Sequence, residues 1–115
     1  MKYPVAATSP ESIVRYTEYY CYFFAVATHE LTGWKILEVG DDEKHYINKT
    51  PDGRYYDVRG FSKVPLNAYG QPDIIQRECT AAEVLDSFSP WIEGLPQARI
   101  DAAHMLARAA SGLGG

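Results

Sequence analysis

The sequence predicts an α+β fold in which a long, buried N-terminal helix packs on a three-stranded antiparallel meander, with two further helices at the C-terminal end. Residues 19–27 are apolar or aromatic at every position, and a helix without a polar stripe has to be buried on several sides. Two segments rich in aromatic and β-branched residues flank a turn sequence at residues 50–53, which is typical of a β-hairpin. The last third of the chain holds a capping-box sequence and an apolar pattern with helical spacing.

Composition predicts one globular domain over residues 1–115, with flexible tails at residues 1–8 and 111–115. The apolar fraction of 46% and the charged fraction of 23% are ordinary for such a domain. A net charge of −4 leaves no basic field for a phosphate backbone, so nucleic acid is not expected as a partner. No apolar run reaches the roughly 18 residues of a membrane span, and residues 1–10 lack the apolar region of a signal peptide. We therefore expect a cytoplasmic protein without a membrane partner.

The first helix is expected to begin at residues 9–11, where Ser-Pro-Glu supplies an N-cap, a proline for the first turn and an acidic side chain. No glycine or proline follows until Gly33, which suits a left-handed C-cap. A continuous helix would span about 22 residues. A break within residues 15–20 is the alternative, and it would place Cys21 at a helix N-terminus instead of in mid-helix.

The predicted strands are residues 35–39, 45–49 and 54–58, and the predicted C-terminal helices are about residues 80–88 and 96–110. Between these two groups, residues 59–72 hold several Gly and Pro residues and show no sustained periodicity. This composition predicts a long loop or strap across one edge of the sheet. It could serve as a lid over a functional site or only as a cover for the sheet.

Turn geometry decides whether His45 and Asp57 can meet. A three-residue loop over residues 51–53, a type I turn followed by a glycine bulge, pairs Thr50 with Arg54. His45 and Asp57 then lie diagonally on one face of the hairpin, and a five-residue loop would set them directly opposite each other. A loop of two or four residues would place them on opposite faces.

Cys21, His45 and Asp57 are the candidate catalytic residues. A cysteine nucleophile needs a base to hold the thiolate, and the base needs a third group to fix its tautomer and orientation. Cys21 on the buried helix, His45 on the strand below it and Asp57 on the neighbouring strand supply these groups in that order.

The order of a helix-borne Cys followed by His and Asp on adjacent antiparallel strands resembles the catalytic core of transglutaminase-like and papain-like cysteine enzymes. The resemblance covers residues 21–60. It implies that Cys21 is a nucleophile that forms a thioester, that His45 is the general base and then the acid, and that Asp57 orients the imidazole. The implied reaction is acyl transfer on an amide by hydrolysis, deamidation or transamidation. We expect a protein or peptide as the substrate, because a chain of this size leaves little room for a deep small-molecule pocket.

The same residues allow a second interpretation. A lone cysteine in an aromatic helix is most often core packing. The chain would then be a non-enzymatic acidic interaction protein, such as a phage or mobile-element inhibitor that binds a host protein. Aromatic residues on the sheet and strap would form its exposed patch, for a partner or for a second copy of the chain: Tyr46, Tyr55, Tyr56 and Trp91.

No metal or cofactor is expected from the sequence. No pair of Cys or His residues has the spacing of a zinc site, and no glycine-rich loop opens a helix as a phosphate cradle does. Cys21 and Cys79 are expected as free thiols, because disulfides are rare in a reducing cytosol.

Overall fold

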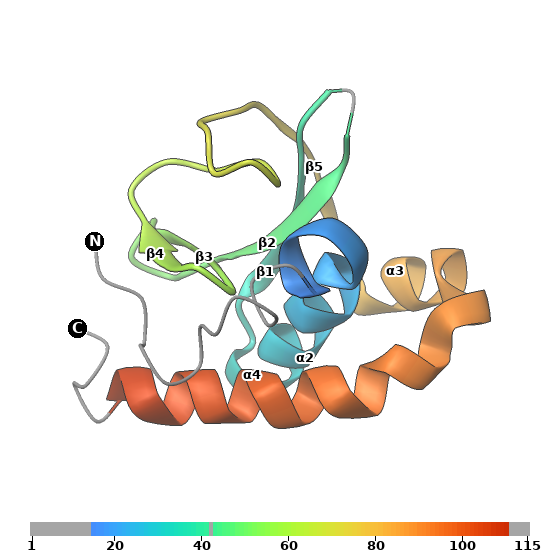
Figure 1. The fold of residues 1–115 in the computed structure, drawn as a ribbon. Coiled ribbons are helices and arrows are strands. Elements are labelled where there is room, and N and C mark those ends of the chain that lie inside the picture. The colour runs from blue at the N-terminus through green and yellow to red at the C-terminus, as the bar shows by residue number, and fades with distance from the viewer. Residues whose placement is uncertain (1–14, 42, 111–115) are drawn as a thin grey trace.

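A computed structural model describes residues 15–41 and 43–110 of the chain. In chain order its elements are η2, a π-helix (Arg15–Tyr19), α2 (Cys21–Thr32), β1 (Lys35–Val39), β2 (His45–Lys49), β3 (Tyr55–Asp57), β4 (Gly60–Ser62), β5 (Ile75–Cys79), α3 (Ala81–Ser87), η3, a 3₁₀ segment (Ser89–Gly94), and α4 (Leu95–Ala110). The strands form one antiparallel sheet in the order β4-β3-β2-β1-β5. Helix α2 lies between this sheet and α4 (Figure 1).

The predicted α+β class is confirmed, but the sheet has five strands instead of three. The two additional strands come from segments that the sequence left as loop or unassigned. β4 follows a tight turn after β3, and β5 is an edge strand in which only Cys79 is buried. A mostly exposed edge strand carries no alternation of apolar and polar residues, so no sequence pattern marks it. The predicted helix start at residues 9–11 and the predicted tails at residues 1–8 and 111–115 lie outside the described residues.

The first helix is broken immediately before Cys21. In η2 the amide of Tyr20 donates to the carbonyl of Arg15, five residues back, at 2.7 Å. Tyr20 itself has φ −119° and ψ 29°, outside the helical range, and α2 begins at the next residue. The Tyr16 hydroxyl donates to Asp101 of α4, which ties η2 to the last helix. Of the two alternatives that the sequence allowed, the break is the one observed.

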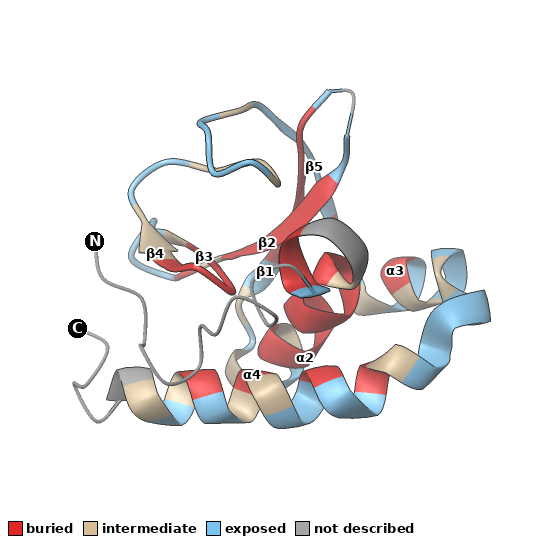
Figure 2. Cartoon of the chain, viewed as in Figure 1, coloured by how far each residue is buried: buried red, intermediate tan, exposed pale blue. Residues whose placement is uncertain are grey.

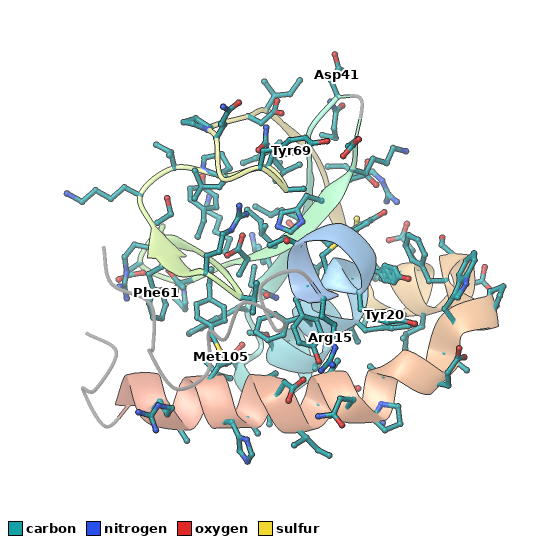
Figure 3. The ribbon with its side chains drawn as sticks, viewed as in Figure 1. Arg15, Tyr20, Asp41, Phe61, Tyr69 and Met105 are labelled. Atoms are coloured by element: carbon teal, nitrogen blue, oxygen red, sulfur yellow. The ribbon has the colours of Figure 1, made fainter. Side chains whose placement is uncertain are left out.

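Helix α2 is buried on all sides over its first two turns, as its sequence predicts. Every residue from Cys21 to Thr28 is buried (Figure 2). Gly33 ends the helix with φ 77°, and its amide donates to the carbonyl of His29 at 2.7 Å. Met105 projects from α4 toward the region between the helices and the sheet and is itself buried (Figure 3). The described helices and one face of the sheet therefore share a core around α2, and a smaller cluster of Leu37, Val39 and Ile47 lies apart from it.

The hairpin has the predicted three-residue loop. Thr50 donates its amide to the Arg54 carbonyl at 2.8 Å, and Gly53, with φ 85°, donates to the Thr50 carbonyl at 3.0 Å. The ladder continues with Lys49 opposite Tyr55 and Asn48 opposite Tyr56. The local chemistry of the turn thus fixes the register of the two strands.

The C-terminal helices also follow their sequence signals. Thr80 and Glu83 form the capping box at the start of α3: the Glu83 amide donates to Thr80 Oγ1 at 3.1 Å, and the Thr80 amide donates to Glu83 Oε1 at 2.9 Å. Helix α4 begins at Leu95 after the 3₁₀ segment η3. Among the residues that the structure describes, none of the helices has the length and apolar content needed to cross a membrane.

Asn48 provides a test of how α2 is held on the sheet. Its side chain is fully buried on β2, and Nδ2 donates to the Ala25 carbonyl of α2 at 2.9 Å. Asn48→Ala should lower the free energy of unfolding by about 2 kcal/mol, because it removes a buried hydrogen bond between layers. Urea denaturation measures this, with the half-buried neighbour changed as Lys49→Ala for the control, expected within about 0.5 kcal/mol of the wild type. Equal losses in the two variants would contradict the assignment.

Candidate active site

His45 and Asp57 meet on the sheet as the turn geometry predicts. His45 is the first residue of β2 and Asp57 the last of β3, and the register places them diagonally on the same face. His45 Nε2 lies 3.2 Å from Asp57 Oδ2. The histidine is fully buried and the aspartate is 6% exposed. The pair is therefore an imidazole and a carboxylate in contact away from bulk water.

Cys21 is the third member of the arrangement. The break at Tyr20 makes Cys21 the first residue of α2, and Cys21 is 8% exposed. His45 uses Nε2 for Asp57, while its Nδ1 is buried and has no aligned hydrogen-bond partner among the described residues. The Cys21 side chain nevertheless acts on the imidazole, raising its pKa through hydrogen bonding and charge. Because Nε2 faces Asp57, Nδ1 is the ring nitrogen that remains for a second partner.

An aromatic bridge holds the first turn of α2 against β2. The ring of Phe88, at the end of α3, stacks on Tyr22 with centroids 3.8 Å apart and meets Tyr46 of β2 edge-on at 5.7 Å. On the other side, Tyr20 packs over Gly94, where an added Cβ would lie 3.1 Å from the Tyr20 ring. These contacts fix the position of the helix start, and with it the position of Cys21.

The start of α2 also offers backbone donors. The first i to i−4 hydrogen bond of α2 runs from the amide of Phe24 to the carbonyl of Tyr20 at 3.1 Å, and Tyr20 supplies no side-chain cap. The amides of residues 21–23 therefore have no acceptor within α2. Together with the positive end of the helix dipole, they favour negative charge at this point, whether on a thiolate or on the oxyanion of a tetrahedral intermediate.

The pKa values of His45 and Asp57 move in opposite directions. Burial works to lower the pKa of His45, but the hydrogen bond with Asp57 and the neighbouring Cys21 outweigh it and raise that pKa to about 9. Burial works to raise the pKa of Asp57, but hydrogen bonds from His45 and Arg59, with their charges, hold it below its ordinary value. At neutral pH the pair is therefore an imidazolium and a carboxylate.

Arg59 is the residue of this site that sequence reasoning missed. Its amide donates to Asp57 Oδ1 at 2.8 Å, its Nε lies 3.2 Å from Oδ2, and Nη2 also donates to Oδ2. The strand register could not have found it, because residues 58 and 59 form the tight turn between β3 and β4, beyond the ladder with β2. The guanidinium also reaches across to the strap, defined from here on as residues 63–74, which connects β4 to β5.

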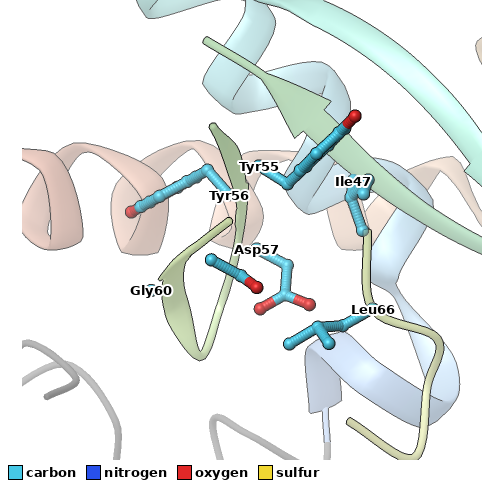
Figure 4. Close-up of a pocket in the computed structure, with 7 residues that line it drawn as sticks. Ile47, Tyr55, Tyr56, Asp57, Gly60 and Leu66 are labelled. Carbon is cyan, nitrogen blue, oxygen red and sulfur yellow. The ribbon is translucent and has the colours of Figure 1, made fainter. Parts of the chain in front are cut away.

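The strap covers the Asp57 side of the site. The carboxylate of Asp57 points toward Leu66 of the strap across a small cavity (Figure 4). The cavity has a volume of about 10 Å³, the space of a single water molecule at most. A substrate therefore has no room inside this cavity between Asp57 and Leu66.

The expected exposed aromatic patch is wrong in two of its four members. Tyr46 and Tyr56 are buried at 7% and 1% exposure, because even-numbered residues of the hairpin face α2 and its aromatic neighbours. Tyr55 is half-buried and Trp91 is exposed. The sheet therefore presents no continuous surface formed by these four residues.

The remaining reactive groups give no second centre. Both cysteines are unpaired, and burial raises the pKa of the Cys79 thiol. Within residues 15–41 and 43–110, no group of three or more Cys, His, Asp and Glu side chains is placed to hold a metal ion. Cys21, His45 and Asp57 therefore remain the candidate residues of the site.

Comparison of the chain with protein-family models, with curated proteins and with solved structures finds no match. The interpretation of this site accordingly depends on its own geometry.

The raised pKa of His45 predicts how stability varies with pH. Between its ordinary value of 6.5 and its folded value of about 9, the native protein holds a proton that the unfolded chain has released. The stabilising contribution of His45 to the free energy of unfolding should therefore be complete below about pH 6.5. It should be lost as the pH rises through about 9. From about pH 6 to about pH 9 the loss attributable to His45 is about 3 kcal/mol.

Urea denaturation across this range measures the effect. His45→Gln should abolish the loss, whereas His104→Gln, at an exposed position on α4, should leave the wild-type slope unchanged. A wild-type slope that persists in His45→Gln would show that another group carries it.

Proposed function

We propose that this protein is a cysteine-dependent amide hydrolase or acyltransferase that acts on a protein or peptide through Cys21, His45 and Asp57. One observation carries the proposal. His45 has a carboxylate on Nε2, while its Nδ1 is buried without an aligned partner and the thiol at the first residue of α2 acts on the ring. In this proposal Cys21 is the nucleophile, His45 is its base and Asp57 orients the base, which are the three roles that acyl transfer through cysteine requires.

The raised pKa of His45 supports the first step. A protonated His45 is an acid that can serve the leaving group, and the nucleophilic form of a cysteine is its thiolate. The thiolate would attack the amide carbon, and the amides at the start of α2 would stabilise the oxyanion that forms. As the C–N bond breaks, the imidazolium would give its Nδ1 proton to the leaving amine, and a thioester on Cys21 and a neutral His45 would remain.

The second step would regenerate the site. Neutral His45 takes a proton from water, the hydroxide attacks the thioester carbon, and the C–S bond breaks to return the thiolate. Hydrolysis of a side-chain carboxamide in this way yields a carboxylic acid and ammonia. An amine in place of water would give transamidation with the same residues.

The restricted access to Cys21 favours a narrow substrate group. Cys21 is only 8% exposed, and Asp57 is only 6% exposed. A side-chain carboxamide at the end of a flexible aliphatic stem can reach a thiol in such a position, whereas the bulky main chain on both sides of a peptide bond needs an open groove. We therefore favour deamidation or transamidation of a glutamine side chain in another protein over cleavage of a folded chain.

Selective alkylation of Cys21 tests the proposal. Iodoacetamide should modify Cys21 of the folded protein at neutral pH much faster than Cys79, whose pKa is raised by burial. Mass spectrometry of the peptides gives both rates in one sample. His45→Ala should slow modification of Cys21 by roughly 100-fold, the contribution typical of a catalytic base, and His104→Ala should not.

Two results would overturn the proposed function. One is a Cys21 that reacts only when the protein unfolds. The other is a folded His45→Ala variant in which Cys21 keeps its wild-type rate. In either case Cys21 is core packing, and the interpretation as a non-enzymatic interaction protein predicts that Cys21→Ala retains full biological effect.

A further inference from the structure

Arg59 holds the carboxylate of Asp57 on both of its oxygens. Oδ1 accepts from the Arg59 amide at 2.8 Å and from Nε at 3.3 Å, and Oδ2 accepts from Nε at 3.2 Å and from Nη2. The side chains of Arg59 and Asp57 are only 8% and 7% exposed. A guanidinium that grips both oxygens fixes the plane of the carboxylate, which a lysine ammonium cannot do.

Arg59 also lies close to His45, and this closeness raises a question of tautomer. Its Nη2 is 3.4 Å from His45 Nε2. When the imidazole is neutral, Nε2 can either donate a hydrogen to Asp57 or accept one from Arg59. Only the first arrangement leaves Nδ1 with a lone pair for the Cys21 proton.

The strap removes the second arrangement. Nη2 carries two hydrogens, and it donates to Asp57 Oδ2 and to the main-chain carbonyl of Asn67 in the strap, the latter at 2.6 Å. No hydrogen of Nη2 is then left for His45 Nε2. The ring nitrogen has Asp57 as its acceptor and has to carry the hydrogen itself.

The Asn67 carbonyl is held in place by the turn of the strap. The Asn67 amide donates to the Gln71 carbonyl at 2.8 Å, and the Gly70 amide donates to the same Asn67 carbonyl at 3.0 Å. Asn67 Nδ2 donates to Asp73 Oδ2 at 3.0 Å. Gly70 has φ 78°, and a Cβ there would lie 3.1 Å from Arg59 Nη1, so the turn also leaves space for the guanidinium.

We propose that Arg59, oriented by the Asn67 carbonyl of the strap, is a positioning residue that fixes Asp57 and thereby holds the hydrogen of neutral His45 on Nε2. The inference rests on the proposed function, because a fixed tautomer is useful only if Nδ1 receives a proton from Cys21. Arg59 touches neither the thiol nor the substrate in this scheme. The strap acts in the same way, as part of the support behind the catalytic residues.

Arg59→Lys tests the proposal with Arg54→Lys as a matched control. Both arginines lie two residues after an aspartate and bond its carboxylate through Nε, but the pair of Asp52 and Arg54 is exposed at the hairpin loop. In Arg59→Lys the pKa of His45 should fall from about 9 toward 6.5, because Asp57 no longer holds the ring. Alkylation of Cys21 at neutral pH should slow roughly 10-fold. Arg54→Lys should change neither quantity.

Nitrogen-15 NMR of the imidazole gives the readout that a merely structural residue would not move. Above the pKa of His45 the wild-type spectrum should show the hydrogen on Nε2, and Arg59→Lys should show a mixture of tautomers. In an Asp57→Asn background, Arg59→Lys should have no further effect on Cys21 alkylation, because Arg59 acts through the carboxylate.

Three outcomes would overturn the inference. A folded Arg59→Lys variant with the wild-type tautomer and alkylation rate is one, and an undiminished effect of Arg59→Lys in Asp57→Asn is another. The third is a wild-type protein in which neutral His45 carries its hydrogen on Nδ1. This measurement needs no variant, so it decides the matter even if Arg59→Lys fails to fold. If Cys21 of the wild type proves unreactive, the proposed function fails, while the tautomer result still decides the inference on Arg59.

Discussion

The buried carboxylate of Asp57 is the interaction on which the site depends. It accepts hydrogen bonds from His45 on β2 and from Arg59 in the turn that follows β3, and Arg59 in turn binds the Asn67 carbonyl of the strap. Three segments are thus connected through one charged group. Burying a charge is costly unless it is paired and fully hydrogen-bonded. A buried ion pair adds little net stability compared with apolar packing, so we take its value here to be the arrangement that it specifies.

The break in the first helix determines the position of Cys21, the candidate nucleophile. An uninterrupted helix would have placed Cys21 in mid-helix, with its amide bonded to the preceding turn. The π-helical turn and the non-helical Tyr20 make Cys21 a first residue, and π-helical turns occur frequently at functional sites. Aromatic packing around Phe88 and the close approach at Gly94 then hold the helix start against the sheet. The same aromatic run that requires burial of α2 thereby also positions the thiol.

Sequence reasoning succeeded where structure is decided locally. The loop at residues 51–53 has its own turn chemistry, and because side chains alternate along a strand, this turn alone settled that His45 and Asp57 share a face. The capping box at Thr80 and the C-cap at Gly33 are equally local signals, and both are observed. The proximity of Cys21 to His45 was an inference from the order of elements, which only tertiary packing could test.

Sequence reasoning failed where the environment decides. β5 is an exposed edge strand with no alternation, so nothing in its composition marks it. Tyr46 and Tyr56 were assigned to a surface although the same alternation that placed His45 and Asp57 on one face puts these tyrosines on the other, toward α2. Arg59 was overlooked because it belongs to a turn, where an arginine is ordinarily solvated. The break before Cys21 stayed undecided because no glycine or proline marks it.

The effect of the thiol on the imidazole is the most direct test of this account. The pKa of His45, measured by NMR titration in the wild type and in Cys21→Ala, reports whether the two side chains interact. The account predicts a pKa of about 9 in the wild type and a lower value in the variant, because the thiol contributes to the upward shift. A pKa that is the same in both proteins would mean that Cys21 and His45 do not act on each other, and the proposed catalytic arrangement would then be wrong.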